Sequence, residues 1–135
     1  MIVEFSEKDI LRSTIVEPAW YRVKIEGYEQ KLASNGKTTN IRLEGVIVAD
    51  ATTGDTKYAG VPVPYFWYFN TGAIGKLKPV IEAADPSVEV KAGFRLNVEG
   101  LVNKELEMFI GNGEYNNSIT NVVTGQYRAL TSQSV

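Results

Sequence analysis

Two alternating segments joined by a tight turn constrain the fold of this chain more than any other feature. Both lie between Trp20 and Ala49, on either side of Ala33-Ser34-Asn35-Gly36. Successive side chains of a β-strand point to opposite faces, so each segment predicts a half-buried strand. Asn35-Gly36 tolerates positive φ and therefore predicts the tip of a hairpin. The residues predicted to face the core are Tyr21, Val23, Ile25, Ile41, Leu43 and Ile47.

The opposite face of this predicted hairpin is rich in cations. The same alternation places one aromatic ring and three basic side chains there, namely Trp20, Arg22, Lys24 and Arg42. We interpret this outward face as a binding surface.

Length and composition indicate a single domain spanning residues 1–135. At 135 residues with 44% hydrophobic residues, the chain is long enough to bury a core. We expect residues 1–18 to form an N-terminal arm with a short helix, and residues 131–135 to form a frayed tail. No apolar run approaches the roughly 20 residues that span a bilayer, and the N-terminus lacks the pattern of a signal peptide. We therefore expect a cytoplasmic protein without a membrane partner.

Two missing residue types narrow the possible chemistry. The sequence contains no cysteine and no histidine, which removes thiolate nucleophiles, the usual general base and the commonest transition-metal ligand. We expect a protein that is not an enzyme and that needs neither a cofactor nor a metal. The acidic residues that could suggest a metal or glycosidase site are better interpreted as a solvated face; they are Glu99, Glu105, Glu107 and Glu114.

Charge is unevenly distributed along the chain. The net charge is −2. From Ala19 to Arg42 there are five cations and two acids, giving 5 − 2 = +3, whereas Glu99 to Glu114 holds one cation and four acids, giving 1 − 4 = −3. A basic hairpin on an acidic body could concentrate a polyanion at one place. The alternative is that mixed charges only keep the surface soluble.

The predicted order of elements is a short helix, three strands, a helix and two or three further strands. Ser6 is suited to cap the first helix, and Pro18 marks the start of the first strand. The third strand, residues 56–69, contains two prolines and is predicted to be an edge or bulged strand. A helix is predicted over residues 76–84, and Pro79 is tolerable only in its first turn. Strands are predicted over residues 94–98, 106–110 and 118–127. This order predicts a mainly β, OB-fold-like five-stranded barrel with a helix between strands 3 and 4. Other small barrels or an α+β sheet are the alternatives.

The hairpin and the third strand together carry the parts of a single-stranded nucleic-acid site. Such sites combine cations for the backbone with rings on which bases stack, each ring worth about 1–3 kcal/mol. Each ring taken alone could instead belong to the core. The candidate cations are Arg22, Lys24, Lys31, Lys37 and Arg42, and the candidate rings are Trp20, Tyr28, Tyr65, Trp67 and Tyr68.

A glycine-rich stretch before the second helix resembles a phosphate loop only superficially. The nucleotide-binding pattern needs a glycine five residues before Gly75-Lys76 and a Ser or Thr after it, but Asn70 and Leu77 occupy these positions. We interpret Lys76 as a solvated or phosphate-contacting side chain.

With these residues considered, the chain resembles a family of small bacteriophage single-stranded DNA-binding proteins with OB-like folds. The resemblance spans roughly residues 6–130. In the first hairpin it rests on Glu17-Pro18-Ala19-Trp20-Tyr21-Arg22-Val23 and Ser34-Asn35-Gly36-Lys37-Thr38-Thr39-Asn40. Beyond the hairpin it rests on the aromatic third strand, on residues 77–84, and on Leu101-Val102-Asn103-Lys104 followed by Glu114-Tyr115-Asn116. It implies a protein that coats single strands during phage DNA replication or recombination, with DNA held on the basic face and the hairpin loop. Many single-strand binders end in an acidic tail that recruits partners, whereas residues 130–135 contain no acid.

The sequence therefore predicts a non-enzymatic protein that binds single-stranded DNA with little sequence preference. The expected partners are single-stranded DNA, further copies of the chain and phage replication or recombination proteins. We expect phosphates to contact Arg22, Lys24, Lys37 and Arg42, and bases to stack on Trp20, Trp67 and Tyr68, with Lys31, Tyr65 and Lys76 completing the site. The alternatives are a phage structural or assembly protein that uses residues 65–69 as a protein interface, and a glycan-binding module.

Overall fold

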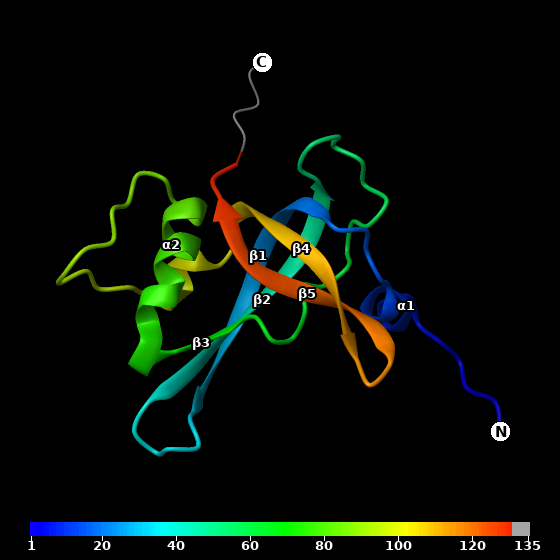
Figure 1. Cartoon of the computed structure of the whole chain (residues 1–135), viewed down its shortest axis with the longest axis horizontal. Coiled ribbons are helices and arrows are strands. Elements are labelled where there is room, and N and C mark those ends of the chain that lie inside the picture. Colours follow the sequence, from blue (N-terminus) through cyan, green and yellow to red (C-terminus); the bar gives the residue numbers. More distant parts are fainter. Residues whose placement is uncertain (131–135) are drawn as a thin grey trace.

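The computed structural model describes residues 1–130 and shows a mainly β protein with short helices (Figure 1). Its α-helices are α1 (Glu7–Ser13) and α2 (Lys78–Ala84), and its 3₁₀ helices are η1 (Thr71–Leu77) and η2 (Val98–Leu101). Its strands are β1 (Ala19–Leu32), β2 (Thr39–Asp50), β3 (Tyr68–Asn70), β4 (Glu105–Tyr115) and β5 (Ser118–Arg128). The two α-helices lie on opposite sides of the strands (Figure 1). The predicted tail, residues 131–135, lies outside the described residues.

The strands form one antiparallel sheet in the order β3-β2-β1-β4-β5. The 14-residue β1 pairs with β2 along its length and with β4 through its first half. Register shifts interrupt the β1–β2 ladder between Arg22 and Val23 and again between Ile25 and Gly27. Such bulges bend a strand and increase its twist, so β1 is bent where it pairs with both β2 and β4.

The core lies on the side of the hairpin that the alternation predicted. Tyr21, Val23 and Ile25 are buried, and so are their neighbours in β2. Apolar side chains of η1, α2 and β4 complete the same cluster; they include Leu77, Val80, Ile81, Leu106, Met108 and Ile110. The helix therefore covers the sheet, as the predicted order of elements requires.

Several local predictions are confirmed. Ser6 caps α1 in a reciprocal capping box with Asp9, β1 starts directly after Pro18, and Gly36 has a φ of 68° at the hairpin tip. Pro79 lies in the first turn of α2. Backbone N–H groups in that turn have no partner within the helix, so the helix loses no hydrogen bond there.

The predicted strand over residues 94–98 is wrong. This segment is a loop that leads into η2, although Leu96 and Val98 still pack against the core. The alternation of apolar residues there supplies contacts to the core without a ladder partner. The long stretch that does pair is β4, which begins at Glu105.

The predicted third strand is shorter than expected, but its position at the edge of the sheet is confirmed. Only Tyr68–Asn70 form a regular strand, and one isolated bridge joins Val46 to Pro62. Between them the chain still follows β2, because Val63 N–H bonds to the Gly45 carbonyl and the Leu43 N–H bonds to the Trp67 carbonyl. Pro62 and Pro64 have no N–H to contribute to a ladder, and the strand is irregular where they occur.

Backbone pairing does not close this sheet into a barrel. β3 and β5 are the two ends of the strand order. Near these ends the Trp67 and Tyr127 rings are stacked with centroids 6.4 Å apart, and Trp67 Nε1 donates a 2.9 Å hydrogen bond to Tyr127 Oη. Side chains thus connect the region before β3 to the end of β5.

Candidate nucleic-acid interface

The polar side of β1, β2 and β3 carries two cross-strand rows of candidate residues. In the first row Glu29 of β1 pairs with Arg42 of β2, which pairs with Tyr68 of β3. In the second row Lys31 pairs with Asn40. Directly paired residues project from the same face of an antiparallel sheet. The register therefore gathers cations, an amide and a ring on one patch.

This patch contains a shallow hollow of about 170 Å³. Its walls are Glu29, Lys31, Asn40, Arg42, Tyr65 and Tyr68. Tyr65 is 65% exposed and Tyr68 is 52% exposed, so both rings are open to a ligand. We call this set of six residues the tyrosine hollow.

Arg42 lines the tyrosine hollow and is held from several sides. Its Nη2 lies 3.3 Å from carboxylate oxygens of both Glu29 and Glu44. Its guanidinium lies 4.5 Å from the centre of the Tyr65 ring, within the range of a cation–π contact. Its Nε is buried without a hydrogen-bond partner. The arrangement fixes a planar, positively charged group beneath an exposed aromatic ring.

The two carboxylates also determine the electrostatics of Arg42. Burial alone acts to lower its pKa, but the hydrogen bond to Glu29 and the negative charge of Glu44 outweigh burial and raise the pKa above its ordinary value. The guanidinium is therefore permanently charged, and its charge is already partly balanced. In this position Arg42 suits orientation of a ring or a base better than attraction of a distant phosphate.

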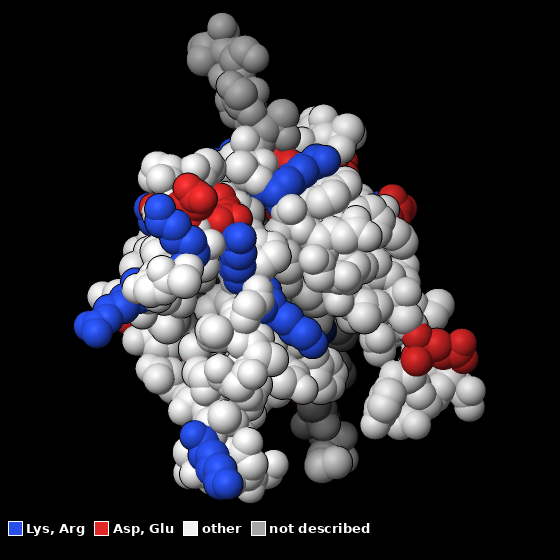
Figure 2. All heavy atoms as spheres, turned by 60° about the vertical axis from the view of Figure 1, so that its left-hand side comes forward, with Lys and Arg blue, Asp and Glu red and all other residues white. Residues whose placement is uncertain are grey.

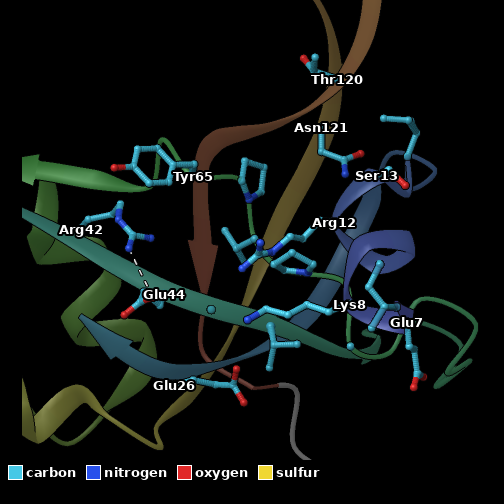
Figure 3. Close-up of a pocket in the computed structure, with 18 residues that line it drawn as sticks. Glu7, Lys8, Arg12, Ser13, Glu26, Arg42, Glu44, Tyr65, Thr120 and Asn121 are labelled. Atoms are coloured by element: carbon cyan, nitrogen blue, oxygen red, sulfur yellow. Dashed lines mark ion pairs between the residues drawn. The ribbon is translucent and has the colours of Figure 1, made fainter. Parts of the chain in front are cut away.

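A larger cleft of about 1040 Å³ adjoins the tyrosine hollow and shares Arg42 and Tyr65 with it. It lies between α1, the middle of β2, the Gly60–Tyr65 segment and the start of β5 (Figure 3). In the close-up, Lys8 and Arg12 extend from α1 into this cleft, whereas the carboxylates of Glu7 and Glu26 are directed away from its centre. We call this space the α1 cleft.

The structure separates Trp20, Arg22 and Lys24 from the tyrosine hollow. Lys24 pairs with Val46 of β2, four residues along the strand from Arg42, which corresponds to about 13 Å. Arg22 forms an ion pair with Glu105 of β4. The expected single basic face is therefore divided, because the hairpin is long and β4 covers only one end of it.

Trp20 is held between two neighbours instead of standing in the open. The Phe109 ring packs edge-on against it at 5.9 Å, and the Arg128 guanidinium lies 4.0 Å from its centre. Both partners belong to the C-terminal hairpin of β4 and β5. Alternation within the first hairpin could not predict these contacts. The ring is half-buried, and a base would have to displace Arg128 to stack on the face that Arg128 covers.

The prediction that Trp67 stacks bases is wrong for this structure. Its side chain is 1% exposed, because it points into the core and stacks on Tyr127. The exposed rings of the aromatic stretch are its neighbours Tyr65, Phe66 and Tyr68. Because five aromatic residues follow one another, alternation could not predict which rings face the core and which face solvent. Tyr28, also considered a candidate ring, packs half-buried against the core.

The remaining predicted cations lie at the periphery of the tyrosine hollow or beyond it. Lys31 is a wall residue. Lys37 is exposed in the hairpin loop, whose shape is set by Asn35 Oδ1 accepting bonds from the N–H groups of Lys37 and Thr38. Lys76 is exposed in η1. On the face in Figure 2 basic side chains are scattered among uncharged and acidic ones instead of forming a continuous stripe.

The predicted solvated acidic face is wrong for two of its members. Glu105 pairs with Arg22, and Glu107, which is 2% exposed, pairs with Arg128. These carboxylates serve as counterions between strands. The register that opposes Arg22 to Glu107 and Glu107 to Arg128 was not deducible from local sequence.

Sequence reasoning missed two kinds of residue at this surface. Phe66 is 76% exposed and packs edge-on against Tyr65 at 6.1 Å. Lys8 and Arg12 line the α1 cleft. The spacing of four residues between Lys8 and Arg12 places them on one face of a helix, and this signal was available in the sequence.

Within residues 1–130 no group of three or more acidic side chains is placed to hold a metal ion, and no helix there has the length and apolarity needed to cross a bilayer. No protein-family model matches the chain, and no curated protein is significantly similar to it.

Proposed function

We propose that this protein binds single-stranded DNA without sequence preference, through an OB-like arrangement of its strands. Five strands with a helix between the third and fourth are the order of the OB-fold, a partly open barrel. The side-chain link between Trp67 and Tyr127 fits such an arrangement, because it joins the ends of the strand order. OB-folds bind oligonucleotides on the face of strands 2 and 3 and on the loops after strands 1 and 4.

The observation that carries this proposal is the tyrosine hollow. It lies on the face of β2 and β3, and two exposed rings adjoin a fixed guanidinium and the Lys31 ammonium there. Rings of this kind accept any base, since every base has a π-face, and cations attract the phosphate backbone. Stacking on these rings does not depend on the identity of the base, which supports binding without sequence preference.

The biological role follows from this proposal and from the resemblance to phage proteins. A protein of this kind would cover single strands exposed during phage DNA replication or recombination. It would require no catalytic residue, cofactor or metal, because binding alone protects the strand. Further copies of the chain and phage replication or recombination proteins are its proposed protein partners.

Fluorescence anisotropy of a labelled oligothymidine tests the proposal. We expect binding at low salt that weakens as salt rises, with a log–log slope of about −0.7 per phosphate contacted. Tyr65→Ala should weaken binding by about 1–3 kcal/mol, and Tyr65→Phe should retain most of the affinity because the ring remains. Arg95→Ala, which removes an exposed cation from the loop before η2, is the control and should change little. Absence of binding by the wild-type protein at low salt would overturn the proposal.

A second candidate is supported by the exposure of Phe66. Phe66 and Tyr65 form a contiguous aromatic pair beside an edge strand, and exposed aromatic residues at a sheet edge are typical of protein interfaces. A structural or assembly protein would use this pair to bind a protein. Association that is insensitive to salt and is lost in Phe66→Ala, without any DNA binding, would favour this function.

A further inference from the structure

The ion pairs divide the basic residues of this protein into two groups. Arg22, Arg42 and Arg128 each lie against one or more carboxylates, as does Lys104. A phosphate that approaches these cations must compete with a carboxylate already in place. The salt dependence of DNA binding should therefore come mainly from basic side chains outside these pairs.

Two cations outside these pairs lie in the α1 cleft. Lys8 and Arg12 belong to none of the ion pairs among residues 1–130. Within α1, their positive charges help to lower the pKa of Asp9. Both side chains extend from α1 towards β2 across the cleft (Figure 3). The acids that line the cleft do not oppose them at its centre, because Glu44 contacts Arg42 and the carboxylates of Glu7 and Glu26 are directed outward.

The α1 cleft and the tyrosine hollow form one continuous surface. Arg42 and Tyr65 line both. A strand stacked on Tyr65 would therefore continue from Lys31 and Tyr68 at one side into the space before Lys8 and Arg12 at the other. Bases would contact the sheet and phosphates would contact α1.

We propose that α1 is the second wall of the binding site, and that Lys8 and Arg12 contact the phosphates of a single strand lying between α1 and β2. This inference rests on the proposed function. α1 suits this role because none of its residues is fully buried and it packs on the core through half-buried Leu11. The segment behind it is anchored by Asn121, whose amide bonds to Thr14 and Val16. Its cations can adjust to a strand without disturbing the fold.

The test compares two double variants in the same salt titration with oligothymidine. Each phosphate contact contributes about 0.7 to the log–log slope, so Lys8→Ala/Arg12→Ala should flatten the slope by about 1.4. Equivalently, the wild-type protein should lose about sevenfold more affinity than this variant between about 50 and about 200 mM salt. The matched control, Lys91→Ala/Arg95→Ala, removes two exposed cations elsewhere and should retain the wild-type slope.

A second measurement follows α1 directly. Amide hydrogen exchange of residues 7–13 should slow when oligothymidine is added to the wild-type protein, and it should not slow in Lys8→Ala/Arg12→Ala. The inference would be overturned if that variant kept the wild-type slope and if oligothymidine did not change exchange in α1 of the wild-type protein. The proposed function would still stand in that case, provided that Tyr65→Ala weakens binding. Failure of the wild-type protein to bind would overturn both.

Discussion

Trp67 and Tyr127 join the two ends of the sheet although they are 60 residues apart. The Trp67 Nε1–H group donates to Tyr127 Oη at 2.9 Å, and the ring planes are inclined by 24°. Trp67 is 1% exposed, and burial raises the pKa of the Tyr127 phenol. This pair therefore links the segment before β3 to the end of β5, where the backbone ladder is absent.

Tyr127→Phe should destabilise the protein by about 1–3 kcal/mol, because it leaves the buried Trp67 Nε1–H without a partner. Denaturant unfolding measures this difference. Tyr115→Phe is the control, since Tyr115 is 71% exposed, and it should change the free energy of unfolding little. Equal stability of Tyr127→Phe and the wild-type protein would show that the Trp67–Tyr127 hydrogen bond does not stabilise the fold.

Gly45→Ala should destabilise the protein by about 1–3 kcal/mol through overpacking. A Cβ at this position would lie 2.8 Å from Trp67 Cζ3 and 3.0 Å from side-chain carbons of Val23 and Val63. Thermal or denaturant unfolding provides the measurement. Gly75→Ala is the matched control, because no atom lies within 4 Å of the corresponding Cβ; similar losses in both variants would argue against tight packing at Gly45.

Stability should decrease in alkaline solution as Tyr21 ionises. Burial raises its pKa from 10.0 to about 12, with Tyr58 and Asp50 acting in the same direction. The folded state therefore favours the neutral phenol. This contribution is complete below about pH 10, where the unfolded phenol is still neutral, and is lost as the pH rises to about 12.

Tyr21→Phe separates this effect from general alkaline unfolding. At neutral pH the variant should be less stable by about 1 kcal/mol, because it lacks the hydrogen bond from Tyr21 Oη to the Glu17 carbonyl. The difference from the wild-type protein should shrink between about pH 10 and about pH 12. Parallel unfolding curves over this interval would show that Tyr21 is not the responsible group.

Ser6→Ala should loosen α1 without unfolding the protein. It removes the capping box with Asp9, at a cost of about 1 kcal/mol to the helix, but α1 buries none of its residues. Hydrogen exchange should therefore accelerate in residues 7–13 while global unfolding changes little. A loss of global stability as large as the loss within the helix would contradict this separation.

Acid should also loosen α1 without unfolding the protein. Hydrogen bonds from the backbone and side chain of Ser6 lower the pKa of Asp9 below 3.8. The helix should keep this support above pH 3.8 and lose it as the pH falls through the lowered pKa of the folded state. Exchange in Asp9→Asn should be faster than in the wild-type protein at neutral pH and should show less of this acid dependence.

Local patterns predicted much of the fold. Alternation in β1 and β2 identified the buried side chains, such as Val23 and Leu43, because the period of a strand is independent of its neighbours. The cap at Ser6, the start of β1 after Pro18 and the position of Pro79 also depend on adjacent backbone groups. The loop over residues 94–98 was mistaken for a strand because alternation cannot show whether a ladder partner exists.

The candidate site depended on more distant relationships. Tyr65 and Tyr68 were identified from sequence as candidate rings, but their exposure and the burial of Trp67 follow from how the irregular edge packs on β2 and meets β5. Bulges and strand register, set by long-range pairing, decided which cations have carboxylate partners.

By itself, the sequence determined the first hairpin, its core-facing residues and the concentration of cations and rings near it, because alternation and turn chemistry act over a few residues. Only the tertiary structure decided that Arg22 is paired with Glu105, that Trp67 is buried, and that Tyr65 and Arg42 share a surface with α1. The physical reason is that ion pairing, burial and cleft formation depend on segments that are distant in sequence and meet only in the folded chain.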